Sequence, residues 1–348
     1  MCAAAPPPPI KSAFAPVEIK QTMLADGVYQ FTIASDGYVE QLNSVAVITD
    51  TDVLLFDTTT RTSTARAILA DLRKITPKPV RYLVNSHWHP DHWSGNSVFV
   101  DSFPNVEIIA SERERDLMLN MAPFIDSYMP KEVAEAEKTV ADLVASGRDD
   151  LGAPLTPAKK DELELEVQRV RDLVTEQTQT RRVFPTLTYT DQLIFRHGGR
   201  EFRFMSVTGD AAGDTVLYLP QEKILITGDA VSYPLPYFTP PLSEHSKSLH
   251  ALAQLDADII VPGHGPAFHD KSYMLLEASL FDEILRQVQV ALRGGATSID
   301  DVEAKMNLQS FQAKFANGDP EVAAQFPDFV KRMVRKAYIE LRDSKEIR

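Results

Sequence analysis

Three histidines and an aspartate fall within six residues of this chain, in the order His87, His89, Asp91 and His92. Imidazole nitrogens and carboxylate oxygens hold catalytic metal ions while leaving a coordination position open for water. Because His87 and His89 alternate after an expected strand, both can point at one ion. Asp91 and His92 lie one step further on and can point at a second ion. The chain has only eight histidines, so scattered surface histidines explain this cluster poorly, and we predict a metal site here.

Two further segments place a possible ligand directly after an expected strand. Asp229 follows the strand expected at 223–226, and His264 follows the strand expected at 256–261. Loops at the ends of strands are where functional residues collect on a rigid scaffold. The single cysteine, Cys2, excludes both an internal disulfide and a cysteine-built zinc site. Any metal therefore rests on histidine and carboxylate ligands.

In order and rough spacing, these segments resemble the metallo-β-lactamase superfamily of hydrolases. The resemblance covers about 27–266 and depends on the His-x-His-x-Asp-His motif at 87–92, the Gly-Asp at 228–229 and the Gly-His-Gly at 263–265. It implies an α/β fold, the αββα sandwich, with the metals at one edge. It also implies the ligands: His87 and His89 for the first metal, Asp91, His92 and His264 for the second, and Asp229 as the bridge.

One position departs from the family pattern. The family usually has Gly-His-Thr-x-Gly-Asp where this chain has Gly-Asp-Ala-Ala-Gly-Asp at 209–214, so the third ligand of the first metal becomes Asp210. A carboxylate can bind zinc, but it makes the loaded site one charge less positive, which weakens the Lewis acid. Oxygen ligands also favour harder ions. We expect two Zn²⁺ ions, with Mn²⁺ or Fe²⁺ as alternatives.

The implied reaction is attack by a metal-bound hydroxide on the carbonyl of a β-lactam, lactone, ester or thioester. β-Lactam and lactone opening lead this group, although a fold alone does not choose between them. Asp91 is expected to orient the nucleophile and to pass its proton on. Tyr233, in the aromatic segment after Asp229, is expected to donate to an oxyanion, with loop packing as the alternative reading. An iron-dependent redox or dioxygenase enzyme of the same fold, and a non-catalytic binding protein altered at Asp210, remain alternative functions.

The elements that must position these residues alternate between strand and helix. A hairpin of 44–48 with 53–56 precedes a helix over 65–72, and a buried-type strand at 80–84 runs into the histidine motif. Asp57, at the end of one of these strands, is expected to hydrogen-bond a ligand histidine. Later strands are predicted at 187–195, 201–207, 215–219, 223–226 and 256–261.

Three segments are predicted: a disordered proline-rich start at 1–16, a metallo-β-lactamase-like domain at 17–270, and a C-terminal helical segment at 271–348 packed on it. The domain carries a helical insertion at about 112–182. Charged amphipathic stripes suggest that the insertion is a solvated hairpin packed by one face, with a lid or a dimer contact as the alternatives. Its second helix is expected to start at Thr156-Pro157, an N-cap followed by proline.

Composition bounds the partners of the chain. Its 348 residues carry 36 Lys and Arg against 49 Asp and Glu, a formal charge of −13, which argues against a nucleic-acid or anionic-membrane binder. No apolar run approaches the roughly 18 residues of a membrane span. A small-molecule substrate is the expected partner, and the oligomeric state stays open. The compartment is also open, with a periplasmic or secreted protein whose signal was trimmed slightly favoured over a cytoplasmic one.

Overall fold

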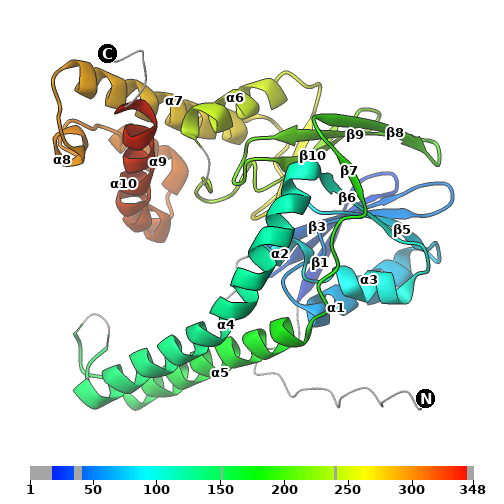
Figure 1. Cartoon of the computed structure of the whole chain (residues 1–348), viewed down its shortest axis with the longest axis horizontal. Helices are drawn as coiled ribbons and strands as arrows, with labels where there is room; N and C mark the ends of the chain where they lie inside the picture. The colour runs from blue at the N-terminus through cyan, green and yellow to red at the C-terminus, as the bar shows by residue number, and fades with distance from the viewer. Residues whose placement is uncertain (1–17, 35–40, 150–151, 239–240, 343–348) are drawn as a thin grey trace.

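The computed structural model consists of two β-sheets packed face to face, with helices on both outer sides (Figure 1). This arrangement confirms the α/β fold and the αββα sandwich that the sequence predicts. The predicted disordered start at 1–16 lies outside the described residues. The structure describes residues 18–34, 41–149, 152–238 and 241–342.

The first sheet has seven strands that lie side by side in sequence order. They are β1 (Ile19–Ala25), β2 (Val28–Ile33), β3 (Leu42–Ile48), β4 (Val53–Phe56), β5 (Val80–Val84), β6 (Glu107–Ser111) and β7 (Leu187–Tyr189). The first four strands pair antiparallel, and β4 to β7 pair parallel. Parallel neighbours need crossover connections. Helices supply the first two of these: α1 (Thr62–Ile75), and then α2 (Pro90–Trp93) with α3 (Asn96–Ser102).

The second sheet has five strands in the order β12-β11-β10-β9-β8. They are β8 (Gln192–His197), β9 (Arg200–Val207), β10 (Asp214–Leu219), β11 (Ile224–Gly228) and β12 (Ile259–Pro262). The prediction of one strand over 187–195 was wrong. The chain leaves the first sheet after β7 and enters the second at β8, so a turn between them divides the segment.

Three hydrophobic layers hold the sandwich together. The middle layer, with Val84 and Phe204, lies between the two sheets. On the outer side of the first sheet, Leu55 and Val80 pack against Ile68 of α1. The central strands β4, β10 and β11 are buried along their whole length, which is why they consist of almost continuous apolar runs.

The predicted insertion is a long helical hairpin that projects from the body of the molecule (Figure 1). It consists of α4 (Glu112–Ser146) and α5 (Pro157–Gln179). Thr156 caps α5 through its side chain and Pro157 is the first helical residue, as predicted. Gly147 ends α4 in the left-handed conformation, with φ of 66°, which glycine adopts at little cost. The buried residues of α4 lie in its first half, where the helix meets the sandwich.

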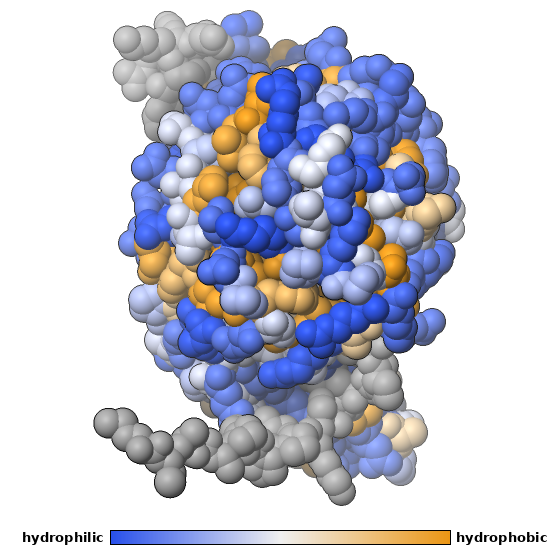
Figure 2. Space-filling view, turned by 90° about the vertical axis from the view of Figure 1, so that its right-hand side faces the viewer, coloured by the Kyte–Doolittle hydropathy of each residue, from blue (hydrophilic) through white to orange (hydrophobic). Residues whose placement is uncertain are grey.

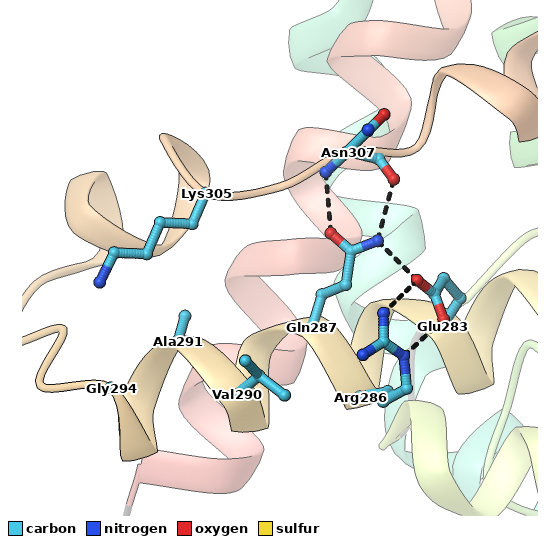
Figure 3. A pocket seen from close by; sticks show the side chains of 8 residues that line it. All are labelled: Glu283, Arg286, Gln287, Val290, Ala291, Gly294, Lys305 and Asn307. Carbon is cyan, nitrogen blue, oxygen red and sulfur yellow. Dashed lines mark hydrogen bonds and ion pairs between the residues drawn. The ribbon is translucent and has the colours of Figure 1, made fainter.

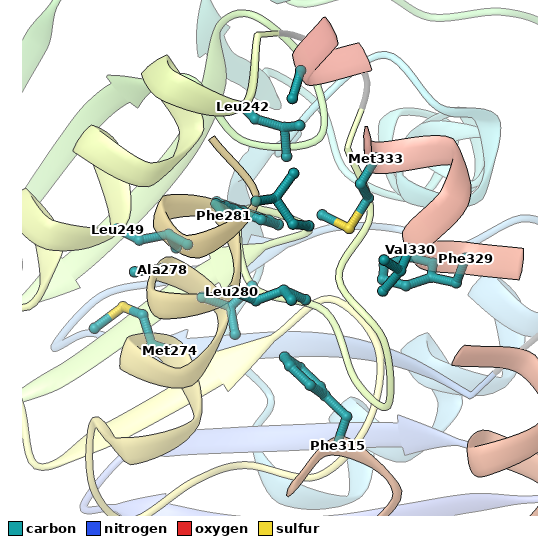
Figure 4. Close-up of a cluster of buried hydrophobic side chains, with 14 of the residues drawn as sticks. Leu242, Leu249, Met274, Ala278, Leu280, Phe281, Phe315, Phe329, Val330 and Met333 are labelled. Carbon is teal, nitrogen blue, oxygen red and sulfur yellow. The ribbon is translucent and has the colours of Figure 1, made fainter. Parts of the chain in front are cut away.

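The outer side of the second sheet is covered by α6 (Leu242–Leu252) and by the C-terminal helices. These are α7 (Ser272–Arg293), α8 (Ile299–Glu303), α9 (Gln309–Ala316) and α10 (Pro320–Arg342). One continuous core joins them, in which Leu242 of α6, Phe281 of α7 and Met333 of α10 meet (Figure 4). The core also contains Val216 and Ile260 of the second sheet. The C-terminal helices thus share the core of the sandwich.

The surface is mixed in character. On the face seen in Figure 2, hydrophobic residues lie in separate groups between hydrophilic ones. Among the residues that the structure describes, no helix combines the length and the apolar character needed to cross a bilayer.

Candidate metal centre

The loops that follow β5, β11 and β12, together with the loop between β9 and β10, converge on one edge of the sandwich. The donor atoms that they carry form two groups, and within each group all ligand atoms lie within 4.8 Å of one another. Donors about 2.0–2.2 Å from a tetrahedral zinc ion lie about 3.4 Å apart, so this spacing suits one ion per group. The first group is His87, His89, Asp210 and Asp229, and the second is Asp91, His92 and His264.

The first group contains the aspartate that stands where the family usually has histidine. Asp210 Oδ2 lies 3.0 Å from His89 Nδ1 and 3.9 Å from His87 Nε2, and the two imidazole nitrogens are 2.8 Å apart. Burial is the main reason why the pKa of His87 lies well below its usual value, with His92 and His89 adding to the effect. Its ring is therefore neutral, which is the state that a metal requires.

Asp229 connects the two groups. Its Oδ2 atom lies 3.8 Å from His87 Nε2 in the first group. The same atom lies 3.4 Å from His92 Nε2 and 3.3 Å from His264 Nε2 in the second. Asp91 Oδ2 completes the second group at 3.2 and 3.3 Å from the same two nitrogens. This is the arrangement expected of one carboxylate shared by two ions.

The chemistry of these donors fits divalent metal ions. Asp229 Oδ1 is buried and accepts no hydrogen bond within the described part of the chain. Buried polar atoms without a partner are uncommon in folded proteins. Burial opposes the ionisation of Asp91, but the neighbouring His92 and His264 hold the pKa of its carboxyl well below the usual range. A site of ionised carboxylates and imidazoles around such atoms is suited to cations.

Asp57 orients a ligand from behind, which confirms the expected hydrogen bond. His92 Nδ1 lies 2.8 Å from Asp57 Oδ2. Ser86 donates to the same carboxylate from its backbone N–H and from its hydroxyl, each at 2.8 Å. With Nδ1 donating to Asp57, the Nε2 lone pair of His92 faces the site.

Two buried acids lie around the first group: Glu114 was not marked by the sequence, and Asp214 was marked only as part of the 209–214 motif. Glu114, in the first turn of α4, accepts a hydrogen bond from the Trp88 N–H at 2.8 Å, and burial raises its pKa to about 7. Asp214 accepts from the backbone N–H groups of Asp210 and Ala211 at 3.0 and 2.9 Å, which fixes the loop that carries Asp210. A glutamate three residues into a helix usually indicates a cap, so no sequence signal marked Glu114 as part of the site.

The loop that carries His264 is held by another residue that the sequence did not mark. Asn43 of β3 donates from its side-chain amide to the carbonyls of Pro262 and Gly265, at 2.9 and 2.7 Å. A side chain at Gly263 would collide with Asp229 Oδ1. Glycine is therefore required where the two ligand loops touch.

The aromatic segment 232–238 lies between the site and the C-terminal helices. Tyr233 packs its ring against Phe268 and Tyr273, and its role at an oxyanion stays a prediction. The ring that meets a predicted ligand is that of Tyr237, 5.4 Å from the His264 ring and edge-on to it. Tyr237, in the same aromatic segment, is therefore a second candidate for the oxyanion donor that is expected from the sequence at Tyr233.

A family model described as the metallo-beta-lactamase superfamily matches residues 37–264. The chain therefore belongs to the metallo-β-lactamase superfamily. That match spans every donor of the two groups.

Among curated proteins, a linear primary-alkylsulfatase from Pseudomonas sp. (strain ATCC 19151) is 26% identical over 253 residues, which are 69% of this chain and 43% of that protein. The chain thus spans less than half the length of this relative. Among solved structures, the stereoselective inverting sec-alkylsulfatase Pisa1 from Pseudomonas sp. superposes with a TM-score of 0.61 at 16% identity, over 93% of this chain and 50% of that one. A metallo-beta-lactamase from Pontibacter korlensis superposes with a TM-score of 0.52 at 19% identity, over 76% and 99%. At these identities the structures are evidence for the fold alone.

Proposed function

We propose that this chain is a metal-dependent hydrolase of alkyl sulfate esters. The observation that carries the proposal is the sequence match to a linear primary-alkylsulfatase over 253 residues, because the matched share of the chain is large. This replaces the carbonyl substrates expected from the sequence as the leading substrate class. The reaction adds water to R–O–SO₃⁻ and yields the alcohol ROH and hydrogen sulfate.

The charge of the site supports an anionic substrate. Four imidazoles and three carboxylates surround the two positions. Metal binding requires the imidazoles to be neutral, so two divalent ions would leave a net positive centre. Bound ions would supply an activated water and would polarise the ester. A monoanionic sulfate ester is attracted to such a centre more strongly than a neutral lactone is.

The residues of the chain supply position and proton transfer. Asp91 is held ionised beside His92 and His264, so the carboxylate oxygen that does not bind an ion can accept the proton of the attacking water and return it to the leaving oxygen. Asp57 fixes the His92 ring, and Tyr237 lies against the His264 ring. These contacts keep the side chains of the second group in place during the reaction.

The proposal is tested by release of inorganic sulfate. Purified chain, loaded with Zn²⁺ or with Mn²⁺, is incubated with octyl sulfate, nitrocefin, an aryl ester, a lactone and a thioester. We expect sulfate release from the alkyl sulfate, its loss after chelation, and its recovery when the metal returns. Hydrolysis of nitrocefin or of the lactone without sulfate release would contradict the proposal and would show that the substrates are carbonyl compounds. Full activity in the metal-free protein would contradict the metal dependence.

A further inference from the structure

A stripe of apolar side chains runs along one side of α4 and begins beside the metal centre. It consists of Leu117, Met121, Phe124 and Tyr128, which recur at helical spacing. Phe124 is 56% exposed and Tyr128 is 38% exposed, and their rings stack at 5.6 Å with 13° between the planes. Stacked aromatic rings at the surface of a helix that already has a separate buried face need an explanation.

The contacts of α4 show which way the stripe faces. The buried face of the helix, with Met118, packs against Trp93 in the sandwich. On one flank of that face, Arg115 Nε donates to the Pro185 carbonyl at 3.2 Å, and Asp126 accepts from Arg182 at 2.9 Å. This flank is therefore directed at the segment that leads from α5 to β7.

The stripe lies on the opposite flank, on the side of the ligand loops. Arg113 belongs to that flank, and its side chain lies against Gly213, where a Cβ would stand 2.8 Å from Arg113 Cβ. Gly213 is in the loop that carries Asp210. At roughly 100° per residue, the stripe residues Leu117 to Tyr128 continue the flank of Arg113. The stripe thus starts at the loop of the first group and runs outward along the hairpin.

We propose that this stripe binds the alkyl tail of the substrate, with its sulfate group at the metal centre and Arg113 beside it. The inference rests on the proposed function and adds the place where the tail lies. Phe124 is about 17 Å along the helix from Arg113 at 1.5 Å per residue, so the stripe suits a long unbranched chain. A guanidinium at the near end matches the anionic head, and flat aromatic surfaces at the far end suit methylene groups.

Another recess in the described chain does not offer such a site. A groove of about 520 Å³ lies along α7. Its polar groups are largely engaged with one another: Arg286 donates to both carboxylate oxygens of Glu283, and Gln287 exchanges hydrogen bonds with the backbone of Asn307 (Figure 3).

The experiment compares chain lengths on the metal-loaded full chain. The stripe variant is Phe124→Ser/Tyr128→Ser. The matched control is Val144→Ser/Leu165→Ser, which removes apolar side chains of similar exposure, 36% and 43%, elsewhere on the same hairpin. Kinetics are measured with hexyl and dodecyl sulfate below their micelle concentrations. Binding is measured by calorimetry with dodecyl sulfonate, which has no ester bond to cleave.

We expect the stripe variant to raise KM for dodecyl sulfate and Kd for dodecyl sulfonate by about tenfold, because one fully buried methylene group changes affinity by up to about fourfold. KM for hexyl sulfate and kcat for both esters should stay unchanged, and the control should match the wild type. Arg113→Gln should raise KM for both chain lengths by the same factor.

The stripe assignment would be overturned by equal effects of the stripe variant on both chain lengths, by an equal effect of the control, or by a dimer that forms through Phe124 and hides it. Failure of the proposed function looks different. If the wild type releases no sulfate but loses dodecyl sulfonate affinity in the stripe variant, the tail site stands and the sulfatase activity falls. If the wild type releases sulfate but the stripe variant binds dodecyl sulfonate as tightly as the wild type does, the sulfatase activity stands and the tail site falls.

Discussion

Glu277 accepts a hydrogen bond at 3.2 Å from the backbone N–H of Ser232, three residues after Asp229. The Ser232 hydroxyl donates to the Asp229 carbonyl at 3.2 Å. From the same face of α7, the Tyr273 hydroxyl donates to the carbonyls of Ser232 and Pro234 at 3.2 and 2.9 Å. A C-terminal helix therefore fixes the loop that presents Asp229, although α7 contributes no metal donor to either group.

This contact predicts that Glu277→Leu lowers metal affinity by about tenfold or more, as the loss of supporting hydrogen bonds around ligands commonly does. Glu277→Gln should stay near the wild type. Burial raises the pKa of Glu277 well above its usual value, so the native side chain is neutral and the amide keeps the acceptor oxygen. Metal content after dialysis measures the effect, and Glu283→Leu on the same helix is the control. Equal metal retention in Glu277→Leu and Glu283→Leu would contradict the anchoring role.

Substitution of Asp57 is expected to weaken metal binding mainly in the second group. Asp57→Ala removes the acceptor that holds His92 Nδ1 and the two Ser86 donors. We expect metal affinity to fall by about 10–100-fold, with the second group affected more than the first because His92 belongs to it. Competition titration with a chelating dye measures both affinities. A variant that binds both ions with native affinity would show that Asp57 does not orient the ligand.

The metal motif could be predicted from the sequence because its signal is local. His87, His89 and His92 follow one strand, and alternation after a strand is enough to predict which of them share an ion. The sandwich fold could be predicted from the same segments because the resemblance to the metallo-β-lactamase superfamily depends on their motifs. Asp57 was expected at the site because it ends a strand beside the motif.

The residues that support the site could not be predicted, because each reaches it from a distant part of the chain. Asn43 contacts the loop of His264 from more than 200 positions away. Glu277 is one acid on an amphipathic helix, and Glu114 looks like an ordinary first-turn glutamate. The single strand expected over 187–195 failed for a related reason: the exchange between sheets is decided by tertiary packing rather than by hydrophobic pattern.

Asp210 offers a direct test of the first metal position. Its side chain faces His89 at 3.0 Å, so Asp210→Ala should lower bound metal from about two ions toward one. Asp210→His restores the usual family residue and should keep two ions, with stronger zinc binding because imidazole nitrogen suits zinc better than a carboxylate oxygen does. Mass spectrometry of the native proteins gives the stoichiometry. Unchanged stoichiometry in Asp210→Ala would remove Asp210 from the ligands.

His245 predicts how stability depends on pH. This histidine of α6 is buried, lies 3.0 Å through Nε2 from the Ala230 carbonyl, and packs on Phe281. Burial lowers its pKa to about 4, from 6.5 in the unfolded chain. Because the folded pKa is the lower one, the unfolded state binds the extra proton. The stabilising contribution is present above pH 6.5 and is lost as the pH falls toward 4.

Because of this pKa difference, the contribution of His245 to the free energy of unfolding falls by about 2 kcal/mol between about pH 7.5 and pH 5. His245→Gln keeps an N–H for the Ala230 carbonyl and does not titrate. The free energy of unfolding of both proteins is measured in denaturant at each pH. The difference in the free energy of unfolding, wild type minus variant, should be about 2 kcal/mol smaller at pH 5 than at pH 7.5. Titration of carboxylates and release of metal affect both proteins alike and cancel in this difference. A stability difference that does not change over this range would show that His245 is not held neutral by burial.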